Sequence, residues 1–319
     1  MPRPLRIEYP GAWYLVKNVV SNGKKLALSD SHRMLFLTVL QETCELYSMT
    51  CHGFVLLDKE YLLIAHTPLG NISHAIRHLN SVYSQRFNTH SGQTGPLFKG
   101  RFKSVLFDAQ DYLLRITRYL HQVPSLKKKV TFPASYTWSS YSSYIGKAPL
   151  HKALTTKTAL QYLSAAQPAA AYKQYVETTY DKDMVAWFTS KKLKPILGSK
   201  EFLMTVQNYQ NSQPTTPSAP SMDILIKSAA SVLNESIDDI LISRRGRNNQ
   251  QLGRTVAMYL CRHIGQHPIK DIANQFNVTH ESAVSVRLAR FQKSLSNDPK
   301  LQSKLRLLKQ TIGKFQVST

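Results

Sequence analysis

The sequence is poor in acidic residues, and it contains no long apolar run. Its 19 aspartates and glutamates stand against 41 lysines and arginines, which gives a formal net charge of +22 and a pI near 9.9. So large an excess of positive charge favours a polyanionic partner, and nucleic acid is the commonest one. A basic ribosomal or membrane-surface protein is the other interpretation of the same charge.

Cysteine is also scarce. The three cysteines, Cys44, Cys51 and Cys261, form no CxxC pair and no Cys/His spacing that would hold a metal. So few cysteines in a chain of this length fit a reducing cytoplasm. The first ten residues contain no apolar segment of a signal peptide, and no run approaches the ~20 apolar residues of a membrane helix. We therefore expect a cytoplasmic protein without membrane contact.

The first 150 residues alternate strand-like and helix-like patterns. The predicted order is strand, helix, two strands, helix, strand, helix, which is typical of a ferredoxin-like α+β fold. Asp30 or Ser31 can cap the first helix, and Asp108 can cap the last. The expected elements are a strand over residues 12–20, a helix over 31–46, a hairpin over 51–65, a helix over 72–87, a strand over 98–107 and a helix over 109–120.

The rest of the chain suggests a second domain. Residues 151–207 have an irregular helical pattern, which we interpret as an extension of the first domain. Residues 208–221 are polar and include three prolines, a composition that predicts a linker. Residues 222–319 follow it with a helical pattern over most of their length. Boundaries are therefore expected at 1–150, 151–207, 208–221 and 222–319.

Six short motifs in the first domain resemble one family, the REP-associated tyrosine transposases, which are single-tyrosine HUH transposases. The motifs are residues 3–14, 51–65, 97–103, 112–114, 118–120 and 138–141. The resemblance implies an HUH-type ferredoxin-like fold that binds DNA hairpins or single strands. It also implies transesterification, in which a helix-borne tyrosine attacks a phosphodiester and forms a 5′-phosphotyrosine link beside a divalent cation.

Tyr119 occupies the position of that tyrosine, but the metal-ligand positions differ. The family's two strand histidines correspond to Glu60 and Leu62, and its polar residue after the tyrosine corresponds to Val123. Glu60 alone could hold Mg²⁺. Because a tyrosine with a pKa near ~10 is a poor nucleophile without a metal, we expect the chain not to be an enzyme and to need no cofactor. Mg²⁺ or Mn²⁺ is expected only if the chain is an active nickase.

Basic residues crowd the motifs of the first domain. The set consists of Arg101, Lys103, Arg115 and Arg118, with three further lysines at residues 127–129. We interpret them as phosphate contacts, which would give affinity without sequence choice. A solvated basic surface is the alternative.

Residues 242–247, 253–262 and 269–276 resemble the carboxy-terminal DNA-binding domain of the replication initiator DnaA. The resemblance implies a basic loop that enters the minor groove and a helix–turn–helix in the major groove. The residues expected to contact DNA are Arg244, Arg245, Arg247, Arg254, His280, Glu281, Ser282 and Arg287. DnaA's Asp-His-Thr-Thr run is replaced from His280 onward, so a different target sequence is expected. No Walker motif is present, which excludes an ATP-driven initiator.

The leading hypothesis is a regulatory, sequence-specific DNA-binding protein derived from a transposase, at the bacterial nucleoid. Duplex DNA would bind the carboxy-terminal domain, and a hairpin or single strand the amino-terminal domain. The alternatives are an active single-strand nickase that uses Tyr119, and a structural nucleoid or RNA-binding protein. Related transposases occur as monomers and dimers, so a homodimer is compatible with the resemblance.

Overall fold

The computed structural model describes residues 6–190, 194–212, 220–242, 251–265 and 267–298, together with 301, 303–305 and 307–308. The chain divides into two compact units, Met1–Ser212 and Gln213–Thr319. Among the residues that the structure describes, no helix has the length and apolar character needed to cross a bilayer.

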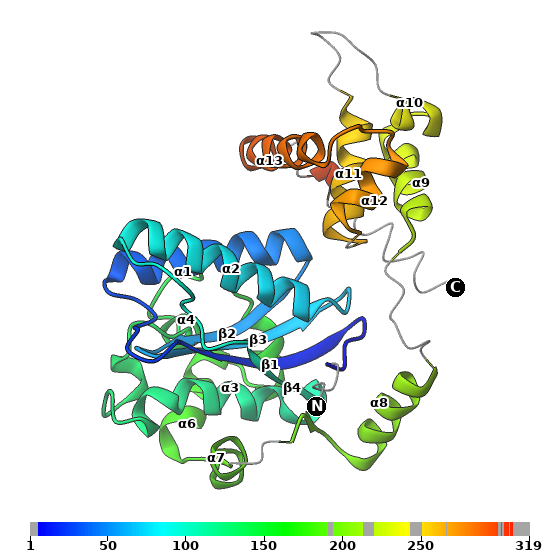
Figure 1. The fold of residues 1–319 in the computed structure, drawn as a ribbon. Coiled ribbons are helices and arrows are strands. Elements are labelled where there is room, and N and C mark those ends of the chain that lie inside the picture. The colour runs from blue at the N-terminus through cyan, green and yellow to red at the C-terminus, as the bar shows by residue number, and fades with distance from the viewer. Residues whose placement is uncertain are drawn as a thin grey trace. The chain divides into compact units, whose positions relative to one another are not determined.

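Unit 1 is built on a five-stranded sheet with the order β2-β3-β1-β4-β5. Its strands are β1 (Ala12–Val19), β2 (Thr50–Leu56), β3 (Glu60–Thr67), β4 (Lys103–Phe107) and β5 (Ile196–Leu197). β1 pairs antiparallel with β3 and β4, β2 pairs antiparallel with β3, and β5 lies parallel to β4. The first four strands have the order of a ferredoxin-like sheet, and the predicted α+β arrangement is observed (Figure 1).

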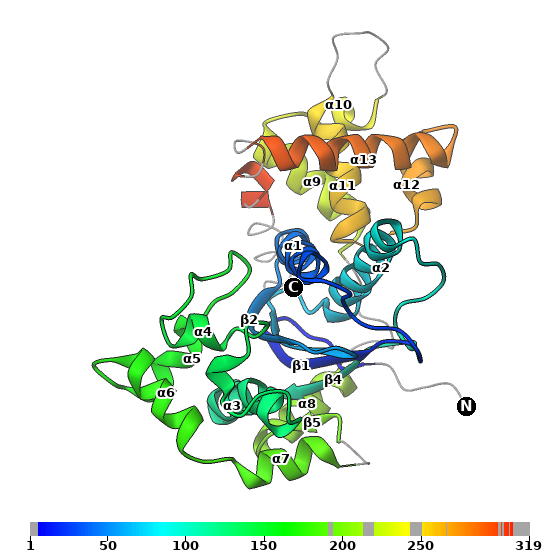
Figure 2. The same cartoon turned by 90° about the vertical axis from the view of Figure 1, so that its left-hand side faces the viewer.

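Helices cover both faces of this sheet. α1 (Asp30–Tyr47) and α2 (Ile72–Ser91) lie on one face, and α3 (Ala109–Leu126) lies on the other, as both views show (Figures 1 and 2). Side chains alternate along a strand, so Tyr61 of β3 meets Phe36 of α1, whereas Ile64 points to the α3 side. Burial on both faces explains why the hairpin sequence is apolar almost throughout.

Short polar side chains set where the helices begin. The Asp108 carboxylate accepts a hydrogen bond from the Gln110 amide at 3.0 Å, which confirms the predicted cap of α3. At α1 the capping position is Ser29, one residue before the first expected candidate, and its hydroxyl pairs with Ser31 and His32 and not with a backbone amide.

The segment after α3 is less regular. It contains α4 (Tyr141–Tyr144), α5 (Lys157–Leu160), α6 (Pro168–Thr178), α7 (Lys182–Thr189), α8 (Lys200–Ser212) and the 3₁₀ turns η1 (Pro133–Ser135) and η2 (Gln161–Leu163). The irregular helical pattern expected over residues 151–207 did not indicate β5, because two residues are too short to show a strand period. Residues 208–212, expected in the linker, belong to α8, and residues 213–219 lie outside the described residues.

The described part of unit 2 is helical. It comprises α9 (Met222–Leu233), α10 (Ile237–Leu241), α11 (Leu252–His263), α12 (Ile269–Gln275) and α13 (Glu281–Asn297). α11 contacts all four other helices and is buried along most of its length. Ser221 and Ser236 cap α9 and α10 by accepting hydrogen bonds from Ile224 and Asp239 amides. α11 therefore forms the core on which α12 and α13 are mounted.

Candidate nucleic-acid interface

Tyr119 lies on α3, and only 8% of it is exposed. Its ring stacks on Phe188 of α7, with centroids 4.4 Å apart and planes 20° apart. Burial, and then the negative charge of Glu60, raise the pKa of Tyr119 to about 12. Because the phenolate is the attacking form of a tyrosine nucleophile, these surroundings favour the unreactive neutral phenol.

Glu60, the candidate metal ligand, begins β3 and is buried. Its Oε2 lies 2.9 Å from the Lys17 ammonium of β1, and its Oε1 accepts from the Lys127 ammonium at the end of α3. Burial works against ionisation, but the hydrogen bonds from Lys127 and Lys17 outweigh it and lower the pKa of Glu60. The carboxylate is thus ionised and already neutralised by two side-chain cations.

The residues around Glu60 do not fit a divalent cation. Leu62 and Val123, which replace expected ligands, are buried hydrocarbons and offer no donor atom. Within the described ranges, no three His, Cys, Asp or Glu side chains gather closely enough to hold a metal ion. A Mg²⁺ ion would also have to displace two ammonium groups from Glu60. The chemistry of this donor set therefore disagrees with the metal that the resemblance implies.

Arg115 and Arg118 converge on Asp181, which caps α7. Arg115 Nε lies 2.8 Å from Asp181 Oδ2, and Arg118 Nη2 lies 3.1 Å from the same oxygen. The hydrogen bond from Arg115, helped by those from the Met184 amide and Arg118, outweighs the effect of burial and lowers the pKa of Asp181 to about 2. The Arg118 guanidinium also lies 4.1 Å from the ring centroid of Tyr175, and its side chain is only 12% exposed. Arg118 therefore joins α3 to α6 and α7, and its role as a phosphate contact stays a prediction.

Arg101 and Lys103 are exposed, whereas Arg115 is half-buried. Arg101 lies near Arg6, since burial and then the Arg101 charge lower the pKa of Arg6. Lys103 is the cross-strand partner of Lys17, on the sheet face that carries Glu60. Sequence reasoning missed Lys17, although a single lysine within an apolar strand was a usable signal of a polar partner.

In unit 2, α12 and α13 are two helices joined by a short turn, over the residues where a helix–turn–helix is expected. Asn277 adopts a left-handed conformation with φ 49°, and the Val278 amide donates to the Ala273 carbonyl at 2.8 Å, which closes α12. The apolar stripe consists of Ile272, Ala273, Phe276, Val284, Leu288 and Phe291, all buried. The first turn of α13 presents exposed side chains at His280, Glu281 and Ser282, whereas Arg287 is half-buried.

Arg254 has a different role from the one predicted. It is 1% exposed, and its guanidinium donates to the backbone carbonyls of Ile240, Leu241 and Phe276. Burial, and then the nearby charge of Arg287, lower the pKa of Arg254 to about 10. Arg254 thus holds α11 against the ends of α10 and α12, and the prediction that it contacts DNA is wrong.

The three other predicted minor-groove residues, Arg244, Arg245 and Arg247, lie outside the described residues.

Comparisons with known proteins do not assign a family. No protein-family model matches the sequence, and no curated protein matches it. Among solved structures, the chain is similar to a REP-associated tyrosine transposase bound to a REP hairpin. The identity is 16% and the TM-score 0.40, over 49% of this chain and 93% of that chain.

Proposed function

We propose that this protein binds DNA sequence-specifically through α12 and α13, and that it acts as a regulator derived from a transposase. The observation that carries the proposal is the exposed polar first turn of α13, which follows a tight turn and is backed by a buried apolar stripe. In helix–turn–helix proteins this part of the second helix enters the major groove, where short polar side chains reach base edges. The net charge of +22 supports a polyanionic partner.

Unit 1 would then supply a second contact, to a hairpin or a single strand, without cleaving it. Support comes from the stacked, neutral Tyr119 and from Glu60, which is paired with Lys17 and Lys127. Two tethered DNA-binding units raise the overall affinity when both sites lie within reach of the linker.

The test of sequence specificity is selection from a randomised duplex pool, followed by binding measurements across a salt series. We expect one enriched sequence whose binding weakens as salt rises. The variants His280→Ala and Ser282→Ala should each lower discrimination by about 1–3 kcal/mol at the base pair they contact. Ser231→Ala, an exposed serine on α9, is the matched control and should change nothing. Equal affinity for all sequences, even at low salt, would refute the proposal.

The alternative function is a nickase that uses Tyr119. Glu60 lies near enough to Tyr119 to raise its pKa, so a cation held by Glu60 would lie near the tyrosine hydroxyl. Single-stranded and hairpin oligonucleotides are incubated with Mg²⁺ or Mn²⁺ and resolved by denaturing electrophoresis. We expect no covalent protein–DNA product. A product that disappears in Tyr119→Phe would show that unit 1 still cleaves.

A further inference from the structure

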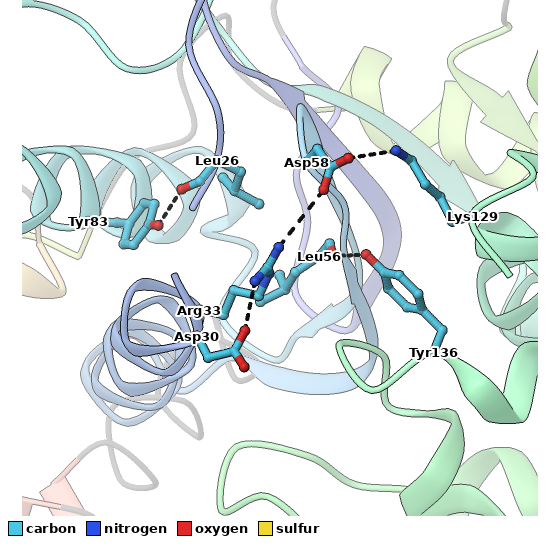
Figure 3. Close-up of polar contacts among 8 residues, drawn as sticks. All are labelled: Leu26, Asp30, Arg33, Leu56, Asp58, Tyr83, Lys129 and Tyr136. Carbon is cyan, nitrogen blue, oxygen red and sulfur yellow. Dashed lines mark hydrogen bonds and ion pairs between the residues drawn. The ribbon is translucent and has the colours of Figure 1, made fainter. Parts of the chain in front are cut away.

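The loop over residues 127–136, after α3, is tied down at three points on the turn between β2 and β3. Lys127 pairs with Glu60, the Lys129 ammonium lies 2.6 Å from Asp58 Oδ2, and the Tyr136 hydroxyl donates to the Leu56 carbonyl at 2.7 Å. Figure 3 shows the Asp58 and Leu56 contacts reaching the turn from one side, with Arg33 on the other side of Asp58. These contacts at both ends hold the loop in one conformation.

Phe132 stands between those anchors, and it is 65% exposed. No other large apolar side chain among the described residues is as exposed. Its backbone is fixed as well, because the next residue, Pro133, is buried and the Phe132 carbonyl accepts from the Ser135 amide. A large aromatic ring presented to water on a rigid loop contributes little to the core, and aromatic rings supply much of the binding energy at interfaces.

The charge of this loop and of the turn that it contacts favours one class of partner. Lys128 and Lys59 are exposed, and Lys127 and Lys129 keep 45% and 43% of their side chains exposed. Among the described residues, Lys127 and Lys129 are paired with the carboxylates of Glu60 and Asp58. The positive groups outnumber the negative ones, so the surface complements an anion. A partner with a flat apolar face and a repeated negative charge is a nucleic acid strand.

We propose that Phe132 stacks on an unpaired base of single-stranded nucleic acid while the lysines at residues 127–129 and Lys59 contact its backbone. An unpaired base is required because the bases of a duplex already stack on one another and present only their edges. The proposal deepens the second contact assigned to unit 1 and rests on it. Base stacking on an aromatic ring tolerates any sequence, so this site adds affinity and α13 supplies sequence choice.

The experiment measures binding of the full chain to a fluorescently labelled, unstructured oligothymidylate by anisotropy. Phe132→Ala should weaken binding by about 5- to 100-fold, the range that loss of one stacked base gives. Tyr162→Ala, an aromatic residue of η2 with 43% exposure, is the matched control and should bind like the parent. Phe132→Leu separates stacking from a general apolar contact and should also bind weakly. Unchanged affinity in Phe132→Ala, or full affinity in Phe132→Leu, would overturn the proposal.

A second readout places the ring on a base. Phe132→Trp should keep the parent's affinity, and its added fluorescence should be quenched when the oligonucleotide binds. A set of oligonucleotides then carries one abasic site each, at successive positions. At one position, the abasic site should reduce the affinity of the parent and leave the affinity of Phe132→Ala unchanged. If Phe132→Ala alters only self-association in sedimentation velocity, the ring belongs to an interface between copies, and the stacking proposal is refuted.

The same variants distinguish this proposal from the sequence-specific one. Phe132→Ala should bind the selected duplex as well as the parent does. If the parent binds that duplex but no single strand at low salt, the stacking site and the second contact both fail, while the role of α13 stands. If the parent selects no duplex but binds the oligonucleotide through Phe132, the sequence-specific proposal fails alone.

Discussion

Unit 1 and unit 2 each contain arginines that the sequence predicted to contact DNA. The groups that these arginines contact in the structure differ between the two units. In unit 1, Arg115 and Arg118 meet the carboxylate of Asp181, whose hydrogen bond raises the pKa of Arg115. In unit 2, the partners that the described residues offer Arg254 are three backbone carbonyls and the ring of Phe276, and burial lowers the pKa of Arg254 to about 10. The same residue type is therefore paired with a carboxylate in one unit and with neutral groups in the other. The position of an arginine in the sequence did not indicate which of these two kinds of partner it would contact.

The largest expected effect is that of Arg254→Ala on unit 2. Removing the guanidinium leaves the three backbone carbonyls that it binds without their donor, which we expect to cost roughly 3 kcal/mol or more. All three tryptophans, Trp13, Trp138 and Trp187, belong to unit 1. In Arg254→Ala, the circular dichroism signal of the helices should therefore begin to fall at a lower temperature, because unit 2 unfolds earlier. The temperature of the tryptophan fluorescence transition, which reports on unit 1, should not change. Arg290→Ala, exposed on α13, is the control, and an equal shift there would contradict the role of Arg254.

Acid should destabilise unit 1 through His121. This ring is fully buried between Tyr172 and Ser140, each 2.7 Å away, and burial lowers the pKa of His121 to about 3. The unfolded chain takes up the proton near pH 6.5, so the stability is complete above that pH and falls as the pH drops toward 3. We expect a loss of roughly 2 kcal/mol between pH 6.5 and 4.5, measured by urea unfolding with tryptophan fluorescence.

His121→Gln cannot titrate and should flatten that pH dependence, even if the variant is less stable at neutral pH. A residual slope is expected from His52, whose pKa burial lowers to about 4. An unchanged slope in His121→Gln would show that other groups carry the acid sensitivity.

Glu60→Gln should have smaller effects, which lower the stability of unit 1 but raise its affinity for single-stranded DNA. The change removes both ion pairs of Glu60, and because Lys17 and Lys127 are nearly half exposed, solvent limits the loss of stability to about 1 kcal/mol. Freeing two ammonium groups should at the same time strengthen binding to single-stranded DNA and increase its salt dependence. Glu42→Gln removes a comparable pair with Arg86 on the opposite sheet face and should leave binding unchanged. Weaker binding in Glu60→Gln would argue for a direct role of the carboxylate.

The smallest effect is expected for Tyr119→Phe. The ring stack with Phe188 is kept, so stability and DNA affinity should each change by less than about 0.5 kcal/mol. Calorimetry and the oligonucleotide titration measure the two quantities. A large loss of binding would mean that the Tyr119 hydroxyl contacts the nucleic acid.

Local pattern predicted much of the architecture. The apolar runs of the hairpin, the Asp108 cap and the apolar stripe of α12 and α13 all depend on neighbours within a few residues, and each was found as expected. Short-range periodicity and capping are properties of the chain itself, which is why they are legible without a structure. β5 escaped detection because its two residues are a strand only through their pairing with β4.

The sequence by itself determined the basic character of the protein, the alternation of strands and helices in unit 1 and the helices α12 and α13 in unit 2, because composition and short-range periodicity can be read from the chain alone. Only the tertiary structure decided which charged side chains are paired or buried inside the protein and which are exposed to a ligand. Lys17 reaches Glu60 across a strand pair, Asp181 reaches Arg118 from 63 positions along the chain, and Arg254 is enclosed by three helices. Such pairings depend on burial and on contacts distant in sequence, and a buried cation must find its partners inside the fold.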